Sequence, residues 1–110
     1  AEVHEHRAAR VSLDHDVRGT ELRGEHLDPA FAAGAEIDLV IEQGVRQRVA
    51  IEIKRSLAPS VSKGFHVGCE DFNATHRFIV YPGPERYPVS NGVTVMPLVV
   101  TMTALRDILG

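Results

Sequence analysis

The chain has 110 residues, which is enough for one compact domain and too few for two. Hydrophobic residues make up 44% and charged residues 25%, a composition that is typical of folded globular proteins and excludes a disordered chain. The net charge of −3 argues against a purely electrostatic nucleic-acid binder, although it permits a local basic patch.

The sequence carries no membrane or secretion signal. Its apolar runs fall short of the roughly 20 residues that a membrane-spanning helix needs, and the N-terminus lacks the pattern of a signal peptide. Cys69 is the single cysteine, which excludes an intrachain disulfide. We therefore expect a cytoplasmic protein with no membrane partner. Because the chain begins at Ala1 rather than Met, we also expect a fragment of a longer protein.

Residues 1–34 form a polar, histidine-rich segment with weak periodicity. The pattern allows a short strand over 11–17 or a helix over 19–27. Imidazoles bind transition metals readily, whereas a solvent-exposed polar segment needs no metal, and both interpretations stay open. The histidines concerned are His4, His6, His15 and His26.

Residues 35–110 give sharper signals and are expected to form the α/β core of one domain. Two runs rich in β-branched residues, 36–42 and 48–54, predict strands, and the Gly-containing connection 43–47 predicts a hairpin between them. Pro59 and Ser60 then open a predicted helix that ends near Phe72. Its apolar face is expected to hold Val61, Phe65, Cys69 and Phe72.

The last third of the chain predicts two more strands and a helix. Thr75–Tyr81 reads as a strand that stops at a Pro-Gly-Pro run, and a turn at Asn91-Gly92 leads into Val93–Met96. A helix over about 102–109 would place Met102, Leu105, Ile108 and Leu109 on one side. The order predicts an α/β (α+β) fold, a mixed β-sheet with flanking helices.

Hairpin arithmetic identifies a candidate site. If the connection is symmetric about residues 43–47, paired positions sum to 90, so Asp38 faces Glu52 and Glu36 faces Lys54. Because strand side chains alternate, one face of the hairpin would carry Asp38, Glu52 and Lys54. The other face would be apolar, with Ile37, Leu39, Ile41, Val49, Ile51 and Ile53.

Two facing carboxylates repel unless something neutralises them. A divalent cation would do so, because Mg²⁺ (or Mn²⁺) is bound by one or two carboxylates, waters and substrate phosphates. The Ile53 carbonyl adds a hard oxygen ligand, and Lys54 could assist an attacking water. A solvated polar face, with Glu36 and Lys54 as a cross-strand ion pair, explains the same residues without a metal.

The spacing of Asp38 and Glu52-Ile53-Lys54 resembles the PD-(D/E)XK nuclease superfamily. The wider strings GAEIDLVIE, VAIEIKRS, FIVYPG and NGVTVMPL are similar to an uncharacterised PD-(D/E)XK-like domain at the C-terminus of bacterial and archaeal AAA-type ATPases. The resemblance covers roughly Gly34 to Leu105. It implies a restriction-endonuclease-like core with its metal site on the hairpin, and a partner ATPase domain in the full-length protein.

The resemblance also implies a function, a metal-dependent nuclease that cleaves DNA. Active members often use a further acid from their first helix, and the segment expected to supply it offers Glu21 or Glu25. A catalytically inactive DNA- or protein-interaction module, or a structural domain that forms homo-oligomers, remains an alternative. Basic residues expected near the hairpin could line a phosphate-binding rim or be scattered solvated charges: Arg46, Arg48, Arg55, Lys63 and His66.

Overall fold

The computed structural model describes the backbone of residues 8–16, 19–28, 36–44 and 46–110, and the side chains of residues 8–13, 36–44 and 46–110. Within these residues one seven-stranded mixed sheet has the order β2-β1-β3-β4-β5-β7-β6. The strands are β1 (Ala8–Asp16), β2 (Gly19–Asp28), β3 (Leu39–Gln43), β4 (Gln47–Ile53), β5 (His76–Val80), β6 (Tyr87–Val89) and β7 (Val93–Met96). The predicted α/β class with a mixed sheet is confirmed.

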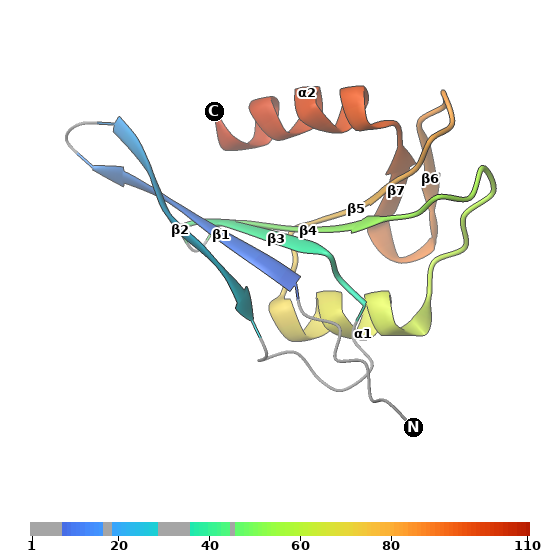
Figure 1. Cartoon of the computed structure of the whole chain (residues 1–110), viewed down its shortest axis with the longest axis horizontal. Coiled ribbons are helices and arrows are strands. Elements are labelled where there is room, and N and C mark those ends of the chain that lie inside the picture. The colour runs from blue at the N-terminus through green and yellow to red at the C-terminus, as the bar shows by residue number, and fades with distance from the viewer. Residues whose placement is uncertain (1–7, 17–18, 29–35, 45) are drawn as a thin grey trace.

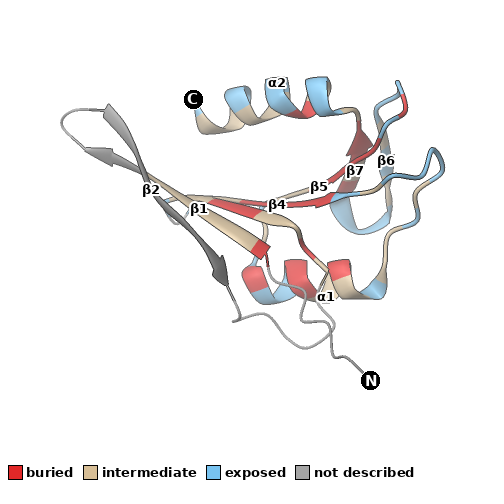
Figure 2. Ribbon diagram, in the orientation of Figure 1, coloured by how far each residue is buried: buried red, intermediate tan, exposed pale blue. Residues whose placement is uncertain are grey.

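The two helices, α1 (Lys63–Phe72) and α2 (Leu98–Leu109), lie on opposite faces of the sheet (Figure 1). Under α1 the core contains Val40, Ala50, Phe65 and Ile79, all fully or almost fully buried. Under α2 it contains Ile41, Val49, Phe78 and Met96, packed against apolar side chains of that helix. The central strands are therefore buried on both faces, as Figure 2 shows, which explains their nearly continuous apolar sequence.

The hairpin register agrees with the prediction. Leu39 pairs with Ile51, Ile41 with Val49 and Gln43 with Gln47, so paired positions sum to 90. The turn contains Gly44 at φ +61°, a conformation that glycine adopts without a side-chain penalty. The prediction of one polar and one apolar face is wrong, because α1 covers the face that holds Glu52. Ile37 also packs on this α1 side, not with Leu39 and Ile41.

Both helices differ from their predicted bounds. Helix α1 begins at Lys63, because the Ser62 hydroxyl caps it by accepting a hydrogen bond of 3.0 Å from the Phe65 amide. The predicted face with Phe65, Cys69 and Phe72 is confirmed as buried. Helix α2 begins at Leu98 rather than near Met102, and Met102 is exposed while Thr101 is buried, so Met102 was placed on the wrong side.

The N-terminal strands correct a second expectation. The strand predicted over 11–17 overlaps β1, with residue 17 outside the described residues. The alternative helix over 19–27 is wrong, because these residues form β2. β1 pairs in parallel with β3 and carries β2 as the outermost strand of the sheet. The short strand β6 was not predicted from the sequence. It contains Pro88, which an outermost strand tolerates because one row of its backbone groups has no ladder partner.

Candidate metal site at the carboxyl end of the central strand

Asp38 and Glu52 come together where the hairpin opens. β3 runs antiparallel to β4, so the residues just before β3 lie beside the carboxyl end of β4. The Asp38 amide donates to the Ile51 carbonyl at 2.9 Å, although the partner of Ile51 in the strand register is Leu39. Asp38 and Leu39 on one strand thus both lie opposite Ile51 on the other, an arrangement that resembles a β-bulge. Such bulges change the direction in which side chains point.

The redirected Asp38 carboxylate takes part in the backbone ladder. Its Oδ2 accepts a hydrogen bond of 2.7 Å from the Ile53 amide. On the other side of β4 the next amide, from Lys54, donates to the Val80 carbonyl at 2.8 Å. Asp38 therefore holds the end of β4 in place, and this position sets its charge beside the end of the strand that carries Glu52.

Glu52 is the buried acid of the site, with 5% of its surface exposed. Its Oε1 lies 3.2 Å from the Lys54 ammonium nitrogen, whereas its Oε2 is buried and has no hydrogen-bond partner among the described residues. A buried oxygen without a partner is costly unless a ligand satisfies it. Lys54 therefore forms its ion pair with Glu52, whereas the alternative interpretation of the sequence expected an ion pair with Glu36.

The environment raises the pKa of the Glu52 carboxyl above its ordinary value. Burial is the largest cause, because it penalises the charged form, and the negative charges of Asp38 and Glu36 act in the same direction. The hydrogen bond and positive charge of Lys54 oppose this shift without cancelling it. A site with excess negative charge and an unsatisfied oxygen suits a cation.

The donor set fits a hard divalent ion. Two carboxylates and the adjacent Ile53 carbonyl are the kind of oxygen ligands that Mg²⁺ binds, with waters or phosphates completing its shell. Among the residues that the structure describes, no group of three or more His, Cys, Asp or Glu side chains lies close enough to hold a metal. The candidate site is therefore a two-carboxylate site, open to further ligands from outside the protein.

Glu21 and Glu25, the proposed additional acids, lie on β2. Strands β1 and β3 separate β2 from β4. At about 4.8 Å per strand step the backbones of β2 and β4 are about 14 Å apart, so the fold does not bring these acids to Glu52. The transition-metal alternative involves His4 and His6, which lie outside the described residues, and His15 and His26, whose side chains lie outside them.

The predicted basic rim divides between the two ends of the sheet. Arg55 follows β4 at the candidate site, and Lys63 begins the helix that crosses back from that end. Arg46 lies at the hairpin turn, at the opposite end of β4. Arg48 pairs with Glu42 at 3.1 Å and lies over the Phe72 ring at 5.0 Å from its centroid, which indicates a structural role.

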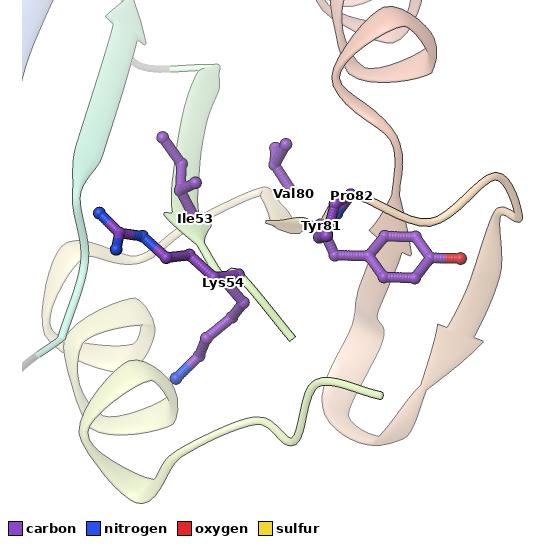
Figure 3. Close-up of a pocket in the computed structure, with 6 residues that line it drawn as sticks. Ile53, Lys54, Val80, Tyr81 and Pro82 are labelled. Atoms are coloured by element: carbon purple, nitrogen blue, oxygen red, sulfur yellow. The ribbon is translucent and has the colours of Figure 1, made fainter. Parts of the chain in front are cut away.

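A depression lies at the carboxyl ends of the parallel strands β4 and β5 (Figure 3), and its lining includes Lys54, which pairs with Glu52. Open α/β sheets commonly bind ligands at this edge. Sequence reasoning missed the contribution of β5, because contacts between parallel strands are not encoded by local spacing. The depression is lined by Ile53, Lys54, Arg55, Val80, Tyr81 and Pro82.

Cys69 is fully buried among the apolar side chains under α1, as predicted. Burial raises the pKa of its thiol to about 12, so the nucleophilic thiolate is nearly absent at neutral pH. We expect the native protein to react with a thiol-specific aromatic disulfide at pH 8 only as fast as it unfolds, and the denatured protein to react at once. Absorbance of the released thiolate measures both rates, and rapid labelling of native protein would contradict this burial.

The fold and the site define a class of protein, a mixed α/β domain with an acidic, lysine-bearing cluster at the end of its central strand. The chain belongs to the family described as Domain of unknown function (DUF4143), whose model matches residues 30–100. That segment contains both acids, Lys54 and the residues that line the depression.

The chain is similar to two mycobacterial proteins. It is 38% identical over 63 residues to the uncharacterized protein Rv2008c of Mycobacterium tuberculosis and to the uncharacterized protein Mb2031c of Mycobacterium bovis. Each alignment covers 57% of this chain and 14% of the relative, so the chain spans a small part of the relatives' length. No solved structure matches the chain. Within the described residues, no helix has the length and apolar character needed to span a bilayer.

Proposed function

We propose that this chain is a PD-(D/E)XK-like domain that binds Mg²⁺ or Mn²⁺ and hydrolyses phosphodiester bonds of DNA. The observation that carries the proposal is the buried, unpartnered Oε2 of Glu52 beside Asp38 and Lys54. The order of strand, hairpin and crossover helix around these residues agrees with the sequence resemblance. An ATPase domain elsewhere in the full-length protein, which the resemblance implies, belongs to the same proposal.

Each residue has a defined task in this proposal. Asp38 and Glu52 would hold the ion, together with the Ile53 carbonyl. A bound divalent ion would polarise the phosphodiester and make a water molecule more acidic. Lys54 donates hydrogen bonds from an ammonium group, and its position next to Glu52 allows it to orient the attacking water or to stabilise negative charge on the phosphate oxygens.

Metal binding is tested by calorimetric titration of the purified chain with Mn²⁺. We expect binding to one site, weakened at least about tenfold by Asp38→Asn or Glu52→Gln, because each change removes a negative ligand. Asparagine can still accept the hydrogen bond from Ile53, so the fold should survive. The control is Glu70→Gln, which changes an exposed carboxylate on α1 and should leave binding unchanged. Equal affinities in all four proteins would overturn the metal site.

A second candidate function is a non-catalytic module that docks DNA or another protein. The observation that favours it is that both acids already have partners within the protein. Lys54 neutralises one oxygen of Glu52, and Asp38 accepts a hydrogen bond from the Ile53 amide. Absence of Mn²⁺ binding, together with retained DNA or protein binding, would favour this module over the enzyme.

A further inference from the structure

The depression beside Lys54 and Arg55 is large enough for a small ligand. Its volume is about 300 Å³, and it lies where β4 and β5 end and their connecting segments begin (Figure 3). The lining residues come from 53–55 on one side and from 80–82 on the other. Two parallel strands therefore contribute both walls, and the same strand end that carries Glu52 forms one of them.

Its surface combines an apolar wall with positive charge. Ile53 is 61% exposed, although it is the last residue of β4 and the four residues before it are buried. Pro82 is also exposed, and Val80 lies between the two in the lining. The charged residues of the depression, Lys54 and Arg55, are both cationic. This apolar wall of Ile53, Val80 and Pro82, together with the two cationic residues, complements a ligand that has a flat apolar part and an anionic part.

We propose that the depression binds one unpaired nucleotide of single-stranded DNA, and this inference rests on the proposed function above. The base would pack against Ile53 and Pro82, and Arg55 would contact a phosphate of the same strand. Lys54 joins the two regions, because its stem lines the depression while its ammonium group pairs with Glu52. Through Lys54, a nucleotide seated here would be linked to the candidate metal site, because the same lysine pairs with Glu52.

Duplex DNA does not suit this surface. In a duplex both faces of each base are stacked on neighbouring bases, so no base face is free to pack against the apolar wall. An unpaired base exposes its faces to water and gains from packing against apolar side chains, and such contacts tolerate any sequence. The cations would act on any strand, since phosphates are common to all nucleic acids. The apolar wall is therefore the element that selects an unpaired strand.

The test measures binding in the presence of EDTA, which separates it from metal-dependent cleavage. Fluorescence anisotropy would compare a labelled single-stranded oligothymidine with a duplex of equal length, and an oligouridine would show whether RNA is also accepted. We expect at least about tenfold tighter binding of the single strand. Ile53→Asn should weaken single-strand binding about fivefold or more, with little effect on the duplex. Because Ile53 is exposed, this variant should fold normally.

Two matched controls define the result. Met102→Asn changes an apolar residue of similar exposure, 57%, on α2 and should have no effect. Arg55→Gln should weaken binding and reduce its salt dependence, whereas Arg106→Gln on α2 should not. Equal affinity for single strand and duplex, an unchanged Ile53→Asn variant, or no binding at all would overturn this inference. Mn²⁺ titration and cleavage assays would still judge the proposed function separately.

Discussion

Replacement of Glu52 by glutamine is expected to abolish Mg²⁺-dependent cleavage of DNA, with a loss of at least about a hundredfold in rate. The substitution keeps the shape of the side chain but removes the negative charge next to the unpartnered buried oxygen. The Lewis-acid contribution of a metal ion amounts to several kcal/mol of transition-state stabilisation, so weaker metal binding is costly. The measurement is the release of fragments from end-labelled oligonucleotides, single-stranded and duplex, with Mg²⁺ or Mn²⁺.

The Glu70→Gln variant is the control for this experiment, because its carboxylate is exposed on the outer side of α1. It should cleave as fast as the unmodified chain. Asp38→Asn should lose activity to a similar extent as Glu52→Gln. Full activity in both site variants would show that cleavage takes place elsewhere in the protein.

Lys54→Met separates catalysis from metal binding. Its ammonium group is 3.2 Å from Glu52 and competes with any cation for that carboxylate. Two unit charges 4 Å apart interact by about 1 kcal/mol in water and more in a partly buried site, so its removal should strengthen Mn²⁺ binding about fivefold or more. Cleavage should nevertheless fall, because the proposed role of the lysine lies in the reaction. A variant that binds Mn²⁺ more tightly and cleaves faster would contradict that role.

The largest stability change is expected for Phe65→Ala. Phe65 is fully buried in the cluster under α1 and belongs to the helix face that packs on β4. Removal of a buried phenyl ring typically costs about 3–5 kcal/mol, since it loses burial and leaves a cavity. In a domain whose total stability is about 5–15 kcal/mol, this loss is a large fraction of the whole.

Urea unfolding, followed by circular dichroism, measures this loss as a lower midpoint at an unchanged slope. The comparison is Val99→Ala on α2, which removes apolar atoms from a side chain that is 77% exposed. Such a surface change is expected to alter stability by less than about 0.5 kcal/mol. Equal effects of the two substitutions would contradict the packing of α1 on the sheet.

The sequence predicts local features of this protein well. The hairpin follows from two β-branched runs around a glycine turn, and its predicted register is confirmed from Leu39 paired with Ile51 to Gln43 paired with Gln47. The predicted pairing of Asp38 with Glu52 lies beyond this register, where the Asp38 amide bonds to the Ile51 carbonyl instead. The buried face of α1 follows from helical spacing, since Phe65, Cys69 and Phe72 recur at intervals of three and four residues.

Other features depend on contacts between distant segments and could not be read from local patterns. The burial of Glu52 results from α1 crossing over its strand. The α2 face follows from packing against Ile41, Val49 and Phe78, which turns Met102 outward and buries Thr101, whose hydroxyl bonds to the Pro97 carbonyl at 2.9 Å. The position of Glu21 and Glu25 follows from the parallel pairing of β1 with β3, a long-range arrangement without a short sequence signature.

The segment after β5 has a fixed shape. The Tyr81 hydroxyl donates to the Glu85 carbonyl at 2.9 Å and accepts from the Glu85 amide at 3.0 Å, so one side chain holds both backbone groups of that residue. A Cβ added at Gly83 would lie 2.3 Å from the Tyr81 ring, which shows how closely the segment is folded onto it. This wall of the depression is thus preorganised, and a ligand that reaches it does not have to order the chain first. Little of the interaction energy is then spent on conformational entropy, so even a small ligand can be retained there.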